Sequence, residues 1–424
     1  MVKTGYKQTE VGVIPEDWKL LLLGKVAKVY RGGSPRPIQN YITNSSNGVN
    51  WIKIGDVREN EKYIYSTQEK ISPDGVAMSR EVRVGDFILS NSMSFGRPYI
   101  LRTNGCIHDG WLAIQEYGHA FSTEYLYYLL SSKIIYKQYI RMAAGSGVKN
   151  LNKDKVSSLM VVCPPLAEQQ RIAEALSDVD GMISSLEKLI AKYKSIKMAC
   201  LQQMFPQDGE TVPRMRLPGF TGAWEQRKLG DQMFIKARIG WQALTKNEYM
   251  ESGDYYLVTG TDINESCHTV DLLRCHYVTK GRYDMDDKIQ LKEGDIIVTK
   301  DGTIGKVAMI TGLDKPATLN SHLFVLRDLS EKLDNYYLLT ILTSPLFEKF
   351  VVGTKTGSTL TGLPQKTMVT FEFTVPNIQE QQKIAGHFRS LTHLITIHQR
   401  KLEKLQKIKQ GMMQQLLTGK IRLV

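Results

Sequence analysis

Cysteine is scarce in this sequence, with five residues among 424. None of them forms a Cys-x-x-Cys pair, and an odd, scattered set does not suit a disulfide framework. The run CHTVDLLRCH places Cys267-His268 near Cys275-His276, but this spacing matches no familiar zinc site. We therefore expect no bound metal and reduced thiols at Cys106, Cys163, Cys200, Cys267 and Cys275.

Long apolar runs are also missing. The opening residues, MVKTGYKQTEVGVIPEDW, contain no apolar core of a signal peptide, and no stretch approaches the roughly 18 apolar residues of a membrane span. Hydrophobic residues make up 42% of the chain and charged residues 23%, as is ordinary for a folded protein in water. The sequence predicts a cytoplasmic protein.

Catalytic signatures are absent as well. Residues 302–306 (GTIGK) are too short for a phosphate-binding loop, and no GxGxxG or HExxH motif occurs. There is no Asn/Asp-Pro-Pro-aromatic tetrapeptide of the kind found in adenine methyltransferases. We interpret Asp284, Asp286 and Asp287 as an acidic surface turn. The sequence predicts no catalytic residue and no cofactor.

Basic residues are in excess, with 55 Lys and Arg against 43 Asp and Glu, a formal net charge of +12. Such an excess favours an anionic partner, most often nucleic acid, although net charge bears on association and not on fold.

The sequence repeats itself when it is shifted by 212 positions, half of its length. Glu168-Gln169-Gln170 then falls on Glu380-Gln381-Gln382, and residues 168–203 share eleven identities with the 36 residues that they overlie. Earlier parts repeat at shorter offsets. Trp18 matches Trp224 at 206, and Gly85-Asp86 matches Gly294-Asp295 at 209. The chain is therefore a duplicated unit, and each copy has a variable globular part followed by a better-matched tail.

Both tails are predicted to be helices of about 40 residues, about 60 Å long at 1.5 Å per residue. Apolar residues recur with period 3.5, the spacing of a coiled-coil seam. Because each seam needs a partner, we expect the two helices to form an antiparallel coiled coil. Packing of each seam on its own globule, or between molecules, is the alternative. The first seam is Ile172, Leu176, Val179, Ile183, Leu186, Ile190 and Tyr193; the second is Ile384, Phe388, Leu391, Ile395, His398, Leu402 and Leu405.

The globular parts show short β-like runs separated by turn signals, with helical segments near 122–141 and 334–350. Residues 206–222, rich in proline and glycine, form a linker. The fold class is α+β, with two pseudo-symmetric α/β domains joined by the two helices. The predicted segments are 1–164, 165–205, 206–375 and 376–424.

The loops of both globules are rich in small, polar and basic residues that suit contacts with phosphates and base edges. Residues 90–97 and 299–306 occupy equivalent places, so a binding role and a solvated turn both stay open for them. The candidate DNA-binding residues are Arg31, Ser34, Arg36, Ser90, Asn91, Ser92, Ser94, Arg97, Lys236, Arg238, Thr299, Lys300, Thr303, Lys306, Lys355 and Ser358.

These residues and motifs resemble a family, the DNA-specificity subunits of type I restriction-modification systems. The resemblance rests on residues 14–18 (IPEDW), the Leu-Gly after each tryptophan, the two Gly-Asp pairs, the two Pro-x-x-x-Glu-Gln-Gln helix starts and residues 217–224 (LPGFTGAW). It covers essentially the whole chain.

The resemblance implies two target-recognition domains, each reading one half of a bipartite, asymmetric site in double-stranded DNA. The helices would then act as a spacer and a docking surface for two modification (methyltransferase) subunits, and restriction (translocase and endonuclease) subunits would join them. The candidate docking residues are Glu168, Gln169, Gln170, Glu380, Gln381 and Gln382.

Two other interpretations stay open from the sequence. One is a coiled-coil scaffold that joins proteins without reading DNA. The other is a nuclease or methyltransferase with an unrecognised active site.

Overall fold

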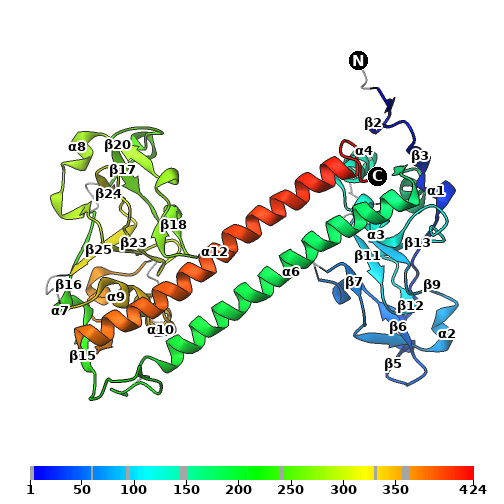
Figure 1. Ribbon diagram of the computed structural model, residues 1–424. Coiled ribbons are helices and arrows are strands. Elements are labelled where there is room, and N and C mark those ends of the chain that lie inside the picture. Colours follow the sequence, from blue (N-terminus) through cyan, green and yellow to red (C-terminus); the bar gives the residue numbers. More distant parts are fainter. Residues whose placement is uncertain are drawn as a thin grey trace. The chain divides into compact units, whose positions relative to one another are not determined.

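The computed structural model describes residues 4–58, 61–91, 96–143, 151–207, 209–238, 243–328, 332–355 and 362–424. The chain forms two compact units (Figure 1). Unit 1 comprises Met1–Ser184 and Glu403–Val424, and unit 2 comprises Ser185–Leu402. The two long helices, α6 (Leu166–Gln203) and α12 (Ile378–Leu416), each contribute to both units. No helix among the described residues is both long and apolar enough to cross a membrane.

Unit 1 is built on two five-stranded sheets, ordered β4-β13-β10-β11-β7 and β5-β8-β6-β12-β9. Its strands are β1 (Tyr6–Thr9), β2 (Gly12–Pro15), β3 (Lys19–Leu22), β4 (Lys28–Arg31), β5 (Ile42–Thr43), β6 (Val49–Ile52), β7 (Tyr63–Ile64), β8 (Glu69–Ile71), β9 (Arg80–Val82), β10 (Phe87–Ser90), β11 (Pro98–Leu101), β12 (Gly105–Ile107), β13 (Trp111–Gln115) and β14 (Met160–Cys163). Its shorter helices are α1 (Leu23–Val26), α2 (Pro73–Val76), α3 (Thr123–Leu130), α4 (Lys133–Ala143) and α5 (Lys153–Ser157).

Unit 2 repeats this plan with sheets ordered β16-β25-β22-β23-β19-β18 and β20-β17-β24-β21. Its strands are β15 (Glu225–Lys228), β16 (Met233–Ala237), β17 (Tyr255–Val258), β18 (Ile263–Asn264), β19 (Thr269–Val270), β20 (His276–Val278), β21 (Gln290–Leu291), β22 (Ile296–Thr299), β23 (Val307–Met309), β24 (Ala317–Leu319), β25 (Leu323–Asp328) and β26 (Glu372–Val375). Its shorter helices are α7 (Leu229–Gln232), α8 (Lys280–Tyr283), α9 (Asn335–Leu342), α10 (Pro345–Lys355) and α11 (Gln365–Met368).

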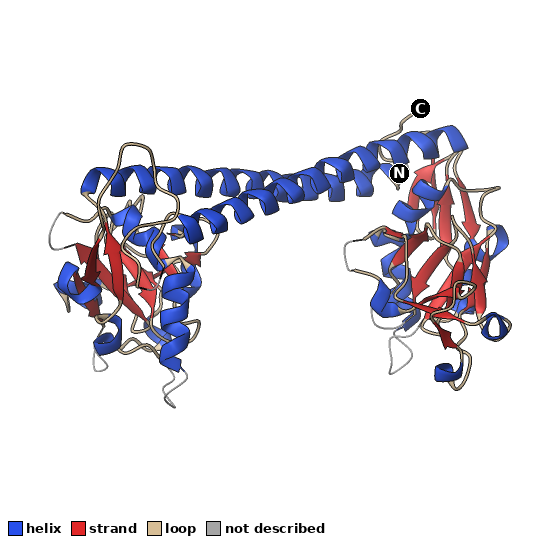
Figure 2. Cartoon of the chain, turned by 90° about the horizontal axis from the view of Figure 1, so that it is seen from below, coloured by secondary structure: helices blue, strands red, loops and turns tan. Residues whose placement is uncertain are grey.

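The strand orders confirm the duplication predicted from the sequence. β4, β13, β10 and β11 of unit 1 correspond to β16, β25, β22 and β23 of unit 2, with the same antiparallel partners. The central strands β10 and β22 are buried on both faces, which suits their β-branched and aromatic residues. Figure 2 shows the strands of each unit gathered into sheets that short helices flank.

The Gly-Asp pairs form the turn that leads into each central strand. Gly85 and Gly294 have φ angles of 95° and 86°, which glycine adopts without steric cost. The following carboxylates, of Asp86 and Asp295, each accept a 2.8 Å hydrogen bond from the backbone N–H three residues earlier. The same local chemistry therefore starts the same strand in both units.

The Leu-Gly pairs allow a close approach between chain segments. Leu23 and Leu229 are fully buried, and a Cβ on Gly24 or Gly230 would lie within 2.8 Å of Ser157 or Val369. Because only glycine leaves room there, the segment before each long helix packs directly on α1 in unit 1 and on α7 in unit 2.

The long helices pair in antiparallel fashion, as the seam predicted. In unit 1, Lys409 of α12 forms a 2.6 Å ion pair with Asp180 of α6. In unit 2, the rings of Tyr193 and His398 lie 5.6 Å apart, and Cys200 Sγ is 3.7 Å from His387 Nε2. Residue numbers rise along α6 while those of their partners on α12 fall, as an antiparallel pair requires.

The first seam residues also pack on their own globule, so the alternative packing holds for part of each helix. Ile172 and Leu176 belong to the core of unit 1, and Ile384 and Phe388 to the core of unit 2. The end of the other helix joins each core, through Leu416 in unit 1 and through Met204 of the chain that directly follows α6 in unit 2. The division of the chain into recognition domains and spacer helices at the predicted bounds stays a prediction.

Candidate nucleic-acid interface

Several backbone hydrogen bonds meet at the end of β10, the central strand of unit 1. The backbone N–H of Ser90 donates to Arg97 O at 3.3 Å, and Gly96 N donates to Ser90 O at 3.0 Å. Asn91 N donates to Gly110 O at 3.2 Å, and Leu151 N donates to Asn91 O at 2.9 Å. These bonds bring three separate parts of the chain together at the end of β10.

Unit 2 contains the same framework of backbone hydrogen bonds. Thr299 N donates to Lys306 O at 2.9 Å, and Gly305 N to Thr299 O at 3.0 Å. Lys300 N donates to His322 O at 2.9 Å, and Leu363 N donates to Lys300 O at 2.5 Å. Each bond corresponds to one in unit 1, although the side chains around it differ.

A short turn before β13 and β25 belongs to this framework, and sequence reasoning missed it. His108 Nδ1 accepts the backbone N–H of Gly110 at 2.9 Å, and Asn320 Oδ1 accepts that of His322 at 3.0 Å. We call residues 33–36, 90–91, 96–97 and 108–110 the first loop cluster, and residues 299–306 and 320–322 the second loop cluster. The two turns lie 212 positions apart, as the repeat requires, and this offset could have revealed them. Their residue types differ, however, so the repeat is not visible in the sequence.

Asp109 is the centre of the polar side chains in the first loop cluster. Its carboxylate lies 3.0 Å from Ser34 Oγ, 3.3 Å from Arg36 Nη2 and 2.9 Å from His108 Nε2. Partial burial raises the pKa of Asp109, but the hydrogen bond from Ser34 and the charges of His108 and Arg36 outweigh it and hold this pKa below its usual value. The Arg36 side chain is 80% exposed and is therefore open to an anion.

The second loop cluster carries its own polar contacts, one of them an ion pair of Lys306. His322 Nδ1 lies 2.5 Å from Asp301 Oδ1, and Lys306 Nζ lies 2.5 Å from Glu265 Oε1. The Lys300 ammonium lies 5.9 Å from the centre of the Phe324 ring. The two clusters thus share a backbone plan and present different donors and acceptors.

The structure gathers several predicted residues at the surface and places others inside. Exposed or half-buried are Arg31, Ser34, Arg36, Arg97, Lys236, Lys300, Thr303 and Lys306; buried are Ser90, Asn91, Arg238 and Thr299. Ser92, Ser94 and Ser358 lie outside the described residues, and Lys355 is the last residue of α10.

The buried candidates hold the loops in place within the fold. Thr299 Oγ1 donates to Thr303 O at 2.5 Å and accepts the N–H of Lys306 at 2.9 Å. Arg238 is 2% exposed, and its guanidinium donates to Leu319 O at 3.0 Å and to Thr318 Oγ1 at 3.1 Å. Desolvation lowers the pKa of Arg238, together with the charge of Arg282. Direct contact with DNA would require these side chains to leave the interior.

The Glu-Gln-Gln motif at the start of α6 is mostly buried. Glu168 is 2% exposed, and its carboxylate accepts hydrogen bonds from Trp18 Nε1 at 2.9 Å and from Arg422 at 2.7 and 2.8 Å. Gln169 accepts from Ser122 N at 2.9 Å and donates to two backbone carbonyls. Gln170 is exposed.

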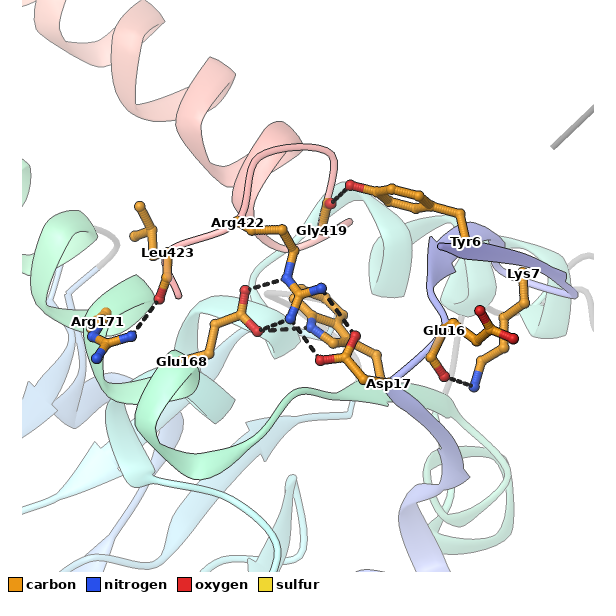
Figure 3. Close-up of polar contacts among 10 residues, drawn as sticks. Tyr6, Lys7, Glu16, Asp17, Glu168, Arg171, Gly419, Arg422 and Leu423 are labelled. Carbon is orange, nitrogen blue, oxygen red and sulfur yellow. Dashed lines mark hydrogen bonds and ion pairs between the residues drawn. The ribbon is translucent and has the colours of Figure 1, made fainter. Parts of the chain in front are cut away.

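Arg422 connects the end of the chain to its beginning within unit 1 (Figure 3). Besides Glu168, its guanidinium binds Asp17 through two hydrogen bonds of 2.9 and 2.7 Å. Nearby, Tyr6 Oη donates to Gly419 O at 3.0 Å. The hydrogen bonds that Arg422 donates to Glu168 and Asp17 raise the pKa of Arg422, and the bond to Asp17 lowers the pKa of that carboxyl.

The same motif in unit 2 uses a different arginine. Arg216, in the segment after α6, binds Glu380 through hydrogen bonds of 2.8 and 2.7 Å, and Glu380 is fully buried. Gln381 accepts from Asp334 N at 2.9 Å, and Gln382 is exposed. Of the six predicted docking residues, Glu168, Gln169, Glu380 and Gln381 therefore contact their own unit, and Gln170 and Gln382 face outward.

The family model "Type I restriction modification DNA specificity domain" matches this chain twice, over residues 15–196 and 222–407. The chain therefore belongs to this family and contains two copies of its domain. The specificity subunit of the type I restriction enzyme MjaVIII from Methanocaldococcus jannaschii is 23% identical, with 96% of this chain and 94% of the relative covered. The MjaIX specificity subunit of the same organism is 25% identical, with 99% and 97% covered.

Two solved structures share the fold. The S subunit of a type I restriction-modification system from M. genitalium superposes with a TM-score of 0.60 at 13% identity, over 94% of this chain and 96% of that one. A chain from a study of complex assembly in a type I R-M system gives a TM-score of 0.56 at 16% identity, over 96% and 99%. These likenesses confirm the predicted fold class of two repeated α/β domains with two long helices.

Proposed function

We propose that this chain is the non-catalytic DNA-specificity subunit of a type I restriction-modification complex. Each unit reads one half of a bipartite, asymmetric site in double-stranded DNA. The observation that carries the proposal is the framework of backbone hydrogen bonds that recurs in both loop clusters around different side chains. A shared framework with different donors and acceptors is what two unlike half-sites require.

Recognition divides between phosphate contacts and base contacts. Exposed or half-buried cations such as Arg36, Lys300 and Lys306 bind phosphates or fork onto guanine, and carboxylates such as Asp109 and Asp301 accept from cytosine. In the free protein Arg36 pairs with Asp109 and Lys306 pairs with Glu265, so DNA binding exchanges internal ion pairs for contacts with DNA. Binding is therefore expected to weaken steeply as salt concentration rises.

The partners of the chain are two modification subunits, which methylate adenine, and restriction subunits, which translocate and cut DNA in the cytoplasm. The exposed Gln170 and Gln382 occupy equivalent positions at the starts of α6 and α12, which suits two equivalent docking sites. The methylated base must leave the DNA stack, and the modification subunit performs that step.

Methylation mapping in the source cell tests the function. We expect one methylated bipartite motif to disappear when the gene for this chain is deleted and to return when it is restored. An unchanged methylation pattern in the deletion strain contradicts the proposal.

Spacing between the half-sites tests the role of the helices. Four residues inserted into α6, with four inserted at the facing position of α12, add about 6 Å at 1.5 Å per residue. The gap between the half-sites should then lengthen by about one or two base pairs, at about 3.4 Å each. A gap of unchanged length would show that the helices do not set it.

A further inference from the structure

A groove in unit 1 lies between α4, the end of α12 and the hairpin of β1 and β2. Its volume is about 760 Å³, and its walls include Lys137 of α4, Lys409 of α12 and Val11 of the hairpin. These elements come from three distant parts of the chain, yet all belong to unit 1.

The walls of the groove are strongly basic. Lys133, Lys137 and Arg141 follow one another at intervals of four residues, so they lie on one face of α4 and repel one another. None of the three forms an ion pair with another residue that the structure describes. Lys420 adds a further cation, Lys409 pairs with Asp180, and Glu10 is the one carboxylate among the described lining residues.

Part of the lining of the groove is apolar. It includes Val11, Val13, Ile134 and Met413, with Val13 39% exposed. DNA backbones present phosphates and no comparable apolar stripe, whereas an amphipathic helix presents apolar side chains flanked by charged ones. A groove whose lining combines apolar and cationic side chains therefore fits an acidic amphipathic helix better than it fits DNA.

The described residues of unit 2 do not repeat the basic face of this groove. At an offset of 212, Pro345 and Gly353 of α10 replace Lys133 and Arg141. Lys197, which corresponds to Lys409, points to His268, whose Nε2 lies 3.5 Å from its ammonium. Among the described residues 209–224, which precede β15, no strand corresponds to β1 or β2.

We propose that this groove binds an acidic amphipathic helix of one protein subunit of the complex, with one helix bound per chain. Carboxylates of the helix pair with Lys133, Lys137 and Arg141, and its apolar side chains cover the apolar residues of the lining. The identity of the DNA target does not enter this inference, which concerns assembly alone.

Charge reversal and photo-crosslinking on the full-length chain test the proposal, with the purified modification and restriction subunits as probes. The variant K133E/K137E/R141E should bind one of these subunits about tenfold or more weakly, because rim charges govern encounter and register. The matched control K25E/R83E/K153E carries the same change in net charge on exposed residues outside the groove, and it should bind normally. Circular dichroism checks that both variants fold.

A photoreactive residue at Gln410, which is exposed and lines the groove, should crosslink to an acidic amphipathic segment of that subunit at one copy per chain. Reversing the charges of the crosslinked segment should restore binding of K133E/K137E/R141E. Wild-type affinity of this variant for both subunits overturns the proposal. So does a crosslink to DNA alone, with a salt slope of DNA binding lowered by about three. Methylation mapping reports on DNA reading separately, so failure of either proposal is recognisable.

Discussion

In both units the buried glutamate at the start of the long helix binds an arginine. We call this contact the joint, and the residues that complete it differ between units 1 and 2. In unit 1 the buried Glu168 binds both Trp18 and Arg422, and Arg422 also binds Asp17. In unit 2 the buried Glu380 binds Arg216, while the indole N–H of Trp224 finds no acceptor among the described residues. The comparison teaches that the joint requires a buried carboxylate opposite an arginine, and that the remaining partners are free to differ.

The largest expected effect follows from removing each arginine. Arg422→Met and Arg216→Met each leave a buried carboxylate without its cation, which costs about 3–5 kcal/mol of unfolding free energy. The loss should be greater for Arg216→Met, because Glu168 keeps its bond from Trp18 while Glu380 has no second side-chain donor among the described residues. Hydrogen exchange, read separately for peptides of each unit, measures both losses.

The exposed Arg171, which donates to Leu423 O at 3.1 Å, provides the matched control. Arg171→Met should change stability by less than about 0.5 kcal/mol, as is usual for a surface substitution. Equal and small losses in all three variants would show that the joint does not stabilise the units.

A pH dependence of unit 2 that comes from a buried histidine is the next largest effect. Burial, with the nearby charge of Lys197, lowers the pKa of His268 from 6.5 to about 4. Between these pH values His268 binds a proton in the unfolded chain but not in the folded chain. The stability of unit 2 should therefore fall as the pH falls from 6.5 to 4. The loss is at most about 3 kcal/mol, at 1.36 kcal/mol per pKa unit.

His268→Asn removes the titrating ring at a position with a φ of 55°, which asparagine tolerates. Urea unfolding at pH 4.5 and 7, followed by hydrogen exchange in each unit, should show a flatter pH dependence in unit 2 of this variant. If the stability of unit 2 depended on pH equally with and without His268, other groups would cause the dependence.

Single substitutions in the two loop clusters should show which unit sets the base preference of which half of the DNA site. Arg36→Ala should relax the base preference of one half of the DNA site and His322→Ala that of the other, each by about 1–3 kcal/mol of discrimination. Competition binding of the assembled complex, with DNAs altered in one half at a time, measures this. If both variants relaxed the base preference of the same half, the model in which each unit reads one half would be contradicted.

The smallest effect concerns the hydroxyl that holds the second loop cluster. Thr299→Val keeps the shape of the side chain but leaves Lys306 N and Thr303 O without their partner, which costs about 1–2 kcal/mol. Thr299→Ser keeps the hydroxyl and should cost less. Thermal unfolding of the two variants compares them directly, and equal losses would assign the cost to packing.

The duplicated fold could be predicted from the sequence because its signals are local or repeat at a fixed offset. The seam from Ile172 to Tyr193 reports a helix through its period alone, and the repeated Glu-Gln-Gln marks equivalent helix starts. The reason for that motif could not be predicted, because the partner of Glu168 lies 254 residues away. The loop clusters were found in part, since Asn91 and Lys300 lie in repeated loops while the turns that meet them carry unlike residues.

The contact between Arg422 and Glu168 also bears on the order in which the chain folds during synthesis. All of unit 2 lies between the two segments of unit 1 in the sequence. At about 5–20 residues per second, the ribosome needs roughly 13–50 s to make the 254 residues that separate this pair. Unit 2 is therefore able to finish folding first, and the globule that is made first is completed last.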